Sequence, residues 1–252
     1  MINILVIAFG DTDRNHLLNY NFDKKWKVKT WLINFWSKRE RKKLKKILSK
    51  QKMDGLILGG KQRIEMPRRM TLDKGYLTTK HRSYKDIEEN REYLWDVLFE
   101  VISYCSNIPI LGICMGCHLL DIYNGSALPI DLGRKFIRSR EETRLNDSLL
   151  FKDMGRYGYF NYNHRQIIKN HSYNAKIIAW NKHRPSGFRW NSKHYGLNFH
   201  IIHSEPDEKK IVKNFIYICR IHNYQQLGYY KSGQYLTLIG ILIALYSLTF
   251  DI

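Results

Sequence analysis

The sequence predicts an α/β domain with a mostly parallel sheet, doubly wound so that helices cover both faces. Largely apolar runs at residues 2–9, 56–58 and 110–113, which alternate little, are typical of strands buried on both faces. Residues 37–52 and 86–104 instead carry apolar side chains at helical spacing. Strands that alternate with helices indicate a parallel sheet, whose functional sites lie at the carboxyl ends of the strands.

The composition indicates a globular protein with a large positive charge. The chain has 252 residues, 44% of them hydrophobic, and a net charge of +19. We expect a domain over residues 1–220 and a C-terminal extension over residues 221–252. The charge favours anionic partners, although lysine is used heavily throughout, and we do not expect a nucleic-acid partner.

The cysteines and the N-terminus both indicate a cytoplasmic protein that is not secreted. Four cysteines in a chain of this length do not form a disulfide framework, so a reducing compartment is expected. The N-terminal MINILVIAFGD lacks a basic leader and a small-residue cleavage site. It therefore predicts a first strand and not a signal peptide.

The C-terminal segment 235–250 carries no charge for 16 residues. This is just short of the roughly 17–25 residues of a membrane-spanning helix. The segment is either a terminal element packed on the domain or a tail anchor that contacts a membrane, and the sequence leaves both interpretations open. With a tail anchor, the protein would be membrane-associated.

The basic segment 37–52 also has two interpretations. Leu44, Ile47 and Leu48 lie at helical spacing among many lysines and arginines. The helix either contacts an anionic surface or exposes a solvated face and docks through these apolar residues.

The stretch PILGICMGCHLL predicts a nucleophile on a tight turn between a strand and a helix. Gly112 and Gly116 flank Cys114, which is the spacing of a nucleophile elbow. The helix N-terminus lowers the pKa of a thiol placed there. The N–H of Met115 is then placed to stabilise an oxyanion, and Gly60, after the strand at 56–58, is a candidate second donor.

Three ordered motifs resemble the class I glutamine amidotransferase superfamily, over most of residues 1–215. They are DGLILGG at 54–60, which resembles the oxyanion strand, IPILGICMGCHLL at 108–120, the elbow, and YGLNFH at 195–200, the start of the histidine box. The resemblance implies a flavodoxin-like fold with Cys114 as the nucleophile.

Within the superfamily the sequence is most similar to the peptidase C26 branch, the γ-glutamyl hydrolase-like enzymes. The long interval from Gly60 to Cys114, the stretch HLLDIYNGSALPIDLG after the elbow and the NHRQ loop at 163–166 indicate this branch. The resemblance implies substrate-binding roles for His164 in that loop and for His118, which stands where the elbow helix usually carries glutamine.

The histidine box departs from the family pattern, so the base has two candidates. Matching by motif gives His200, but Ile202 then stands where the family has glutamate. Matching by His-x-Glu spacing gives His203 as the base with Glu205 as the group that orients it. In a strand, residues two apart share a face, which favours the second pairing. The five consecutive matching positions of Gly-Leu-Asn-Phe-His favour His200, which we take as the first candidate.

These features predict a cysteine-dependent hydrolase of γ-glutamyl amide bonds that works through a thioester at Cys114, without a metal or other cofactor. The chain contains no synthase domain, so an amidotransferase would need a separate synthase partner. The alternative is a catalytically impaired relative that serves as a binding or regulatory module at an anionic surface. A Cys114–Cys117 redox pair at the helix start is a third interpretation, but it gives the flanking glycines no role.

Overall fold

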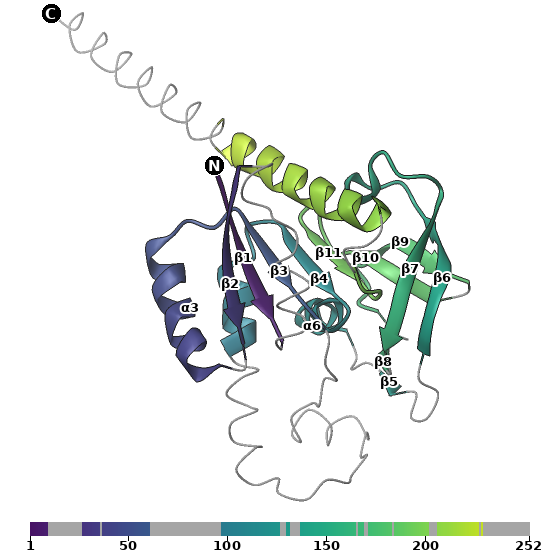
Figure 1. The fold of residues 1–252 in the computed structure, drawn as a ribbon, viewed down its shortest axis with the longest axis horizontal. Coiled ribbons are helices and arrows are strands. Elements are labelled where there is room, and N and C mark those ends of the chain that lie inside the picture. The colour runs from purple at the N-terminus through teal and green to yellow at the C-terminus, as the bar shows by residue number, and fades with distance from the viewer. Residues whose placement is uncertain are drawn as a thin grey trace, which may run out of the picture.

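The computed structural model describes residues 1–9, 27–35, 37–60, 97–126, 130–131, 137–164, 166–168, 171–182, 184–201, 206–226 and 228. In this part of the chain the main sheet has nine strands, in the order β2-β1-β3-β4-β11-β10-β9-β6-β7 (Figure 1). Their bounds are β1 (Ile2–Ala8), β2 (Val28–Asn34), β3 (Gly55–Leu58), β4 (Ile110–Ile113), β6 (Ile137–Leu145), β7 (Tyr157–His164), β9 (Lys176–Asn181), β10 (Arg184–Arg189) and β11 (His194–Leu197).

One half of this sheet is parallel and the other is antiparallel. Strands β2, β1, β3, β4 and β11 run parallel to their neighbours, whereas the pairs from β11 to β7 are antiparallel. An antiparallel bridge joins Asn161 in β7 to His200, three residues beyond β11. Because β7 is also the last strand of the nine-stranded sheet, the antiparallel half curls back towards the end of β11.

The helical elements lie around the parallel half. They are α3 (Lys38–Lys50), α6 (Met115–Tyr123), the 3-10 turn η1 (Leu149–Phe151), and helical residues 97–104 and 206–226. A separate two-stranded ladder pairs β5 (Ile130–Asp131) with β8 (Gln166–Ile167). None of the helices in the described residues is long and apolar enough to span a membrane.

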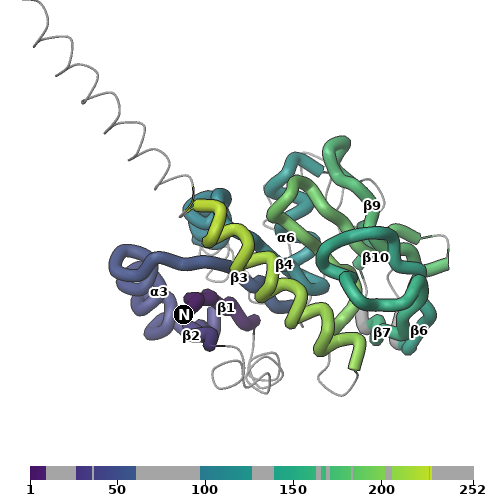
Figure 2. The backbone as a smooth tube through the Cα atoms, turned by 90° about the horizontal axis from the view of Figure 1, so that it is seen from above, coloured from purple at the N-terminus to yellow at the C-terminus, as the bar shows by residue number. Residues whose placement is uncertain are grey.

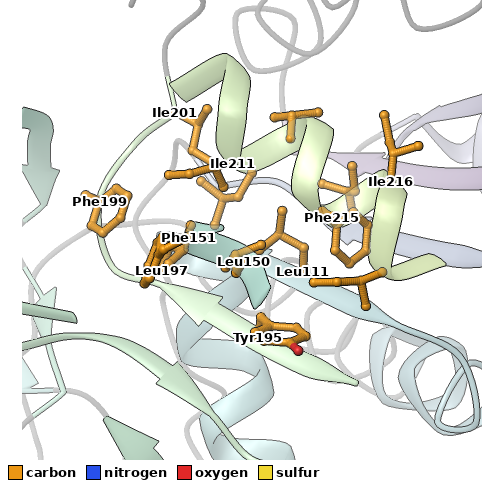
Figure 3. Close-up of a cluster of buried hydrophobic side chains, with 14 of the residues drawn as sticks. Leu111, Leu150, Phe151, Tyr195, Leu197, Phe199, Ile201, Ile211, Phe215 and Ile216 are labelled. Carbon is orange, nitrogen blue, oxygen red and sulfur yellow. The ribbon is translucent and has the colours of Figure 1, made fainter. Parts of the chain in front are cut away.

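One face of the sheet packs against the helix at 206–226. Ile211 and Phe215 of this helix belong to one buried cluster with Leu111 of β4 and with Tyr195 and Leu197 of β11 (Figure 3). The helix crosses this face of the parallel strands (Figure 2). Its inner side chains are those that repeat every three or four residues, as expected for an amphipathic helix on a sheet.

The opposite face packs against α3, residues 97–104 and α6. Leu5 and Ile7 of β1 point to this face, whereas Ile4 and Val6 point to the other, since side chains alternate along a strand. The hydroxyl of Tyr104 donates to the carbonyl of Leu48 over 2.8 Å, which ties the two neighbouring helices together. The two buried clusters therefore form a three-layer α/β fold, as predicted.

Most elements on which the prediction depended are present, and two strands of the main sheet were not predicted. The strands at 2–9, 56–58 and 110–113 are confirmed. The closing helix that the sequence predicts over residues 209–220 is confirmed as well. That helix runs to residue 226 and so passes the expected boundary at 220. Strands β2 and β6 were missed, because β2 is a partly exposed edge strand and β6 reads as a charged segment. Residues 61–85 are basic and poorly patterned, which predicts a long loop, and they lie outside the described residues. The apolar segment 235–250 lies outside them as well.

Candidate active site

Cys114 has the conformation expected of a nucleophile elbow. It links β4 to α6 with φ 49° and ψ −103°, a region that non-glycine residues seldom adopt. Its N–H donates to the carbonyl of Leu197 over 2.7 Å, and its carbonyl accepts from the N–H of Cys117 and of His118 over 3.0 and 3.2 Å. These bonds hold the strained turn in place, with Cys114 at the N-terminus of α6.

The glycines that flank Cys114 let α6 lie directly on the strand backbones. A Cβ atom on Gly112 would lie 2.4 Å from the carbonyl oxygen of Gly116, and one on Gly116 would lie 2.2 Å from the carbonyl oxygen of Leu58. Atoms do not approach this closely, and backbone atoms cannot swing aside. The two glycines are therefore required by the contact of the elbow helix with β4 and β3.

Gly60 meets the elbow from the neighbouring strand. A Cβ atom on Gly60 would lie 2.2 Å from the carbonyl oxygen of Ile113 and 2.4 Å from the amide nitrogen of Met115. The chain that leaves β3 thus touches the turn at the position where the sequence predicts an oxyanion site. The structure brings Gly60, Cys114 and Met115 together.

His200 lies at the same edge of the sheet as Cys114. Strands β4 and β11 are parallel neighbours, with Ile113 paired to Leu197, so their carboxyl ends coincide. His200 follows Leu197 by three residues, is half-buried, and donates its N–H to the carbonyl of Asn161 over 2.8 Å. The other candidates, His203 and Glu205, lie outside the described residues.

The two histidines expected to bind substrate lie in different elements. His118 is in the second turn of α6 and is only 2% exposed, so it faces the interior next to the elbow. His164 is the last residue of β7, where it pairs with Ile137 of β6. It lies three residues beyond the Asn161–His200 bridge, and its side chain is outside the described part of the chain.

Asp121 and Cys117 are buried ionisable residues of α6, next to His118. The carboxylate of Asp121 accepts from the N–H and hydroxyl of Ser172 and from the indole N–H of Trp190, over 3.2 to 3.3 Å. Burial raises the pKa of Asp121, and these donors oppose the shift. Burial, followed by the Asp121 carboxylate, raises the pKa of the Cys117 thiol well above its usual value, so Cys117 stays protonated inside the helix packing.

Asn161 and Glu208 were not predicted from the sequence. Asn161 forms the bridge to His200, and its side chain donates to the carboxylate of Glu208 over 3.4 Å. Glu208 is fully buried in the first turn of the helix at 206–226. Acidic residues are common at helix starts because they complement the helix dipole, so no sequence signal indicated that this one turns inwards.

Three features lie together at the carboxyl ends of the strands: a strained cysteine at a strand-to-helix turn, a strand end with glycines beside it, and a histidine. This arrangement is typical of a class of cysteine-dependent α/β enzymes. The family model for glutamine amidotransferase class-I matches residues 88–219, more than half of the chain. This protein therefore belongs to the class I glutamine amidotransferase family.

Solved structures support the same fold at low sequence identity. A protein from Thermoplasma acidophilum that is assigned as a GMP synthase subunit is 18% identical with a TM-score of 0.64, and the match covers 90% of this chain and 98% of that one. A glutamine amidotransferase from Thermotoga maritima is 14% identical with a TM-score of 0.55, covering 89% and 85%. One from Methylobacillus flagellatus is 12% identical with a TM-score of 0.51, covering 80% and 71%. A search of curated proteins found no match.

Proposed function

We propose that this protein hydrolyses γ-glutamyl amide bonds through a γ-glutamyl thioester at Cys114, with His200 as the general base. The conformation of Cys114 carries the proposal. A φ of 49° at a non-glycine residue costs free energy, and such strain persists where the surrounding structure over-determines it. Here the strain holds a thiol at the carboxyl edge of the sheet, at the start of a helix whose dipole favours the thiolate.

The proposed reaction has two halves. The sulfur of Cys114 attacks the γ-carbonyl carbon, His200 accepts the thiol proton, and the backbone N–H groups of Gly60 and Met115 stabilise the oxyanion. The carbon–nitrogen bond then breaks, and His200 returns the proton to the leaving amine. Water, deprotonated by His200, attacks the thioester and releases the γ-glutamyl acid and the free thiol.

The test is hydrolysis of glutamine and of a γ-glutamyl anilide by the full chain. We expect Cys114→Ser to lower kcat by at least about a thousandfold, because a serine hydroxyl is a far weaker nucleophile without a matched base. The matched control is Cys117→Ala, which removes the neighbouring buried thiol and should keep most of the activity. Activity that survives Cys114→Ser, or that is lost equally with Cys117→Ala, would contradict the proposal, and the second result would favour a redox pair.

We further infer that the amine released can be ammonia used by a separate synthase. The support is the structural relative assigned as a GMP synthase subunit, because that name implies a partner for the relative. Measuring ammonia release from glutamine tests this inference. Release that is slow for the chain alone and faster with a co-purified partner would support it, whereas exclusive turnover of γ-glutamyl amines would favour the hydrolase type.

A further inference from the structure

Residue 208 occupies an unusual position for a charged side chain. Glu208 is 0% exposed although it lies in the first turn of the helix at 206–226, where acidic residues are ordinarily solvated. Burying a carboxylate costs free energy unless hydrogen bonds or an opposite charge compensate. One compensating contact is the side-chain amide of Asn161, which donates to Oε1 over 3.4 Å.

The pairing between β7 and the end of β11 shows which side chains share a face with Asn161. Residues directly opposite in an antiparallel bridge point to the same face, with Cβ atoms about 4.5–5.5 Å apart. The bridge pairs Asn161 with His200. The His200 side chain therefore lies beside the amide that contacts Glu208.

The aromatic neighbours confirm this alternation. Phe160 and Phe199 stack with ring centroids 4.2 Å apart, and Tyr162 meets Phe199 edge-on at 5.9 Å. With Ile201 these aromatic residues belong to the buried cluster that packs against the helix at 206–226. Figure 3 shows Phe199 and Ile201 of this cluster beside the helix. Because neighbouring side chains alternate along a strand, Asn161 and His200 point together away from these aromatic rings, and the Asn161 amide still reaches Glu208.

We propose that Glu208 is the positioning residue that orients His200, acting beside the Asn161 amide. This proposal rests on the proposed function, in which His200 is the base. It also accounts for the departure in the histidine box, where Ile202 stands in place of a carboxylate two residues after the histidine. A carboxylate beside the imidazole fixes its tautomer and stabilises the imidazolium that forms when Cys114 loses its proton.

The test is the pH dependence of Cys114 alkylation by iodoacetamide in the full chain, followed by peptide mass mapping. This readout needs no bound glutamine. We expect Glu208→Gln, which keeps the shape and removes the charge, to slow alkylation at about pH 6.5 roughly tenfold and to move the rate profile to higher pH. Glu208→Asp, which restores the charge at shorter reach, should recover part of the rate.

Two controls separate positioning from folding. Asp54→Asn removes another buried carboxylate, which accepts from the N–H of Asn3 at the amino ends of the strands. This variant should leave the pH profile of Cys114 alkylation unchanged. In a His200→Ala background, Glu208→Gln should add no further shift, because Glu208 acts through His200. If Glu208→Gln does not fold, Asn161→Ala, at a half-buried position, should give a smaller shift in the same direction.

If Glu208→Gln folds, an unchanged pH profile of Cys114 alkylation in this variant would overturn the proposal. If it does not fold, an unchanged pH profile in Asn161→Ala would overturn it. A shift with Glu205→Gln and none with Glu208→Gln would overturn it as well, in favour of the His203–Glu205 pairing. Failure of the proposed function is a different result: the wild type would then alkylate at Cys114 with the predicted coupling to Glu208 and yet hydrolyse no γ-glutamyl amide.

Discussion

At the scale of single residues, the elbow depends on the absence of side chains as much as on the cysteine. The sequence places a glycine two residues before and two residues after Cys114, and the structure gives the reason for each glycine. Gly112 faces the carbonyl of Gly116, and Gly116 faces that of Leu58. The spacing of the glycines was readable from the sequence, but their contact partners were not, because Leu58 is distant along the chain.

Adding one methyl group at Gly116 should disturb the elbow. Alanine is intrinsically the better helix former by about 1 kcal/mol, so any destabilisation by Gly116→Ala must come from the clash with Leu58. We expect a net loss of about 1–3 kcal/mol in the free energy of unfolding, together with a marked fall in hydrolysis. Urea unfolding and the γ-glutamyl assay measure the two effects.

The control for this prediction is Gly155→Ala, where a new Cβ atom would meet its nearest neighbour at an ordinary 3.6 Å. It should change the free energy of unfolding by less than about 0.5 kcal/mol. Gly116→Ala with wild-type stability and activity would show that α6 does not need to lie on the β3 backbone.

At the scale of elements, α3 shows how a very basic helix docks. Ser37 caps its N-terminus by accepting from the N–H of Glu40, and Leu44 is its one buried residue. Ile47 and Leu48 lie partly buried beside it. The structure thus shows the docking face of the second interpretation of this segment, with its lysines exposed on the outer side.

Leu44→Ala should test whether this single side chain holds the helix. Leu44 is 1% exposed, and truncating a buried leucine typically costs about 2–5 kcal/mol. In a chain of this size that corresponds to a fall in Tm of roughly 5–15 °C. Exposed Lys45→Ala next to it is the control and should leave Tm nearly unchanged. Equal Tm values for the two variants would show that α3 contributes little to the fold.

The antiparallel half shows where sequence patterns fail. Among the side chains of β6 that the structure describes, only Thr143 and Leu145 are buried, so the strand has too few apolar residues to be recognised. The bridge from β7 to His200 depends on how the whole ladder curls, which no local pattern encodes. For this reason the sequence located Cys114 and its glycines but missed Asn161 and Glu208.

At the scale of the whole molecule, buried histidines make stability depend on pH. His194 is 3% exposed, and its Nε2 lies 2.9 Å from the carbonyl oxygen of Ser106. Burial lowers the pKa of His194 in the folded state. The unfolded chain therefore binds more protons below the ordinary histidine pKa of about 6.5, and stability falls as the pH drops through this range.

We expect the free energy of unfolding to decrease from about pH 7 to about pH 5, with His194 contributing at most about 1.4 kcal/mol per pH unit. His194→Gln keeps an amide donor for Ser106 and should flatten this slope. The same change at half-buried His222, whose pKa burial also lowers, should flatten it less. Urea titrations at several pH values measure the slopes, and an unchanged slope in His194→Gln would contradict the prediction.

The central claim is that Cys114 is an activated nucleophile held on a strained elbow. Intact mass of the full chain after incubation with a diazoketone analogue of glutamine tests this most directly. We expect a single adduct that maps to Cys114, is formed slowly or not at all by His200→Ala, and is unaffected by Cys117→Ala. A folded protein with no adduct, although small alkylating agents reach Cys114, would contradict the claim and favour a non-catalytic binding module.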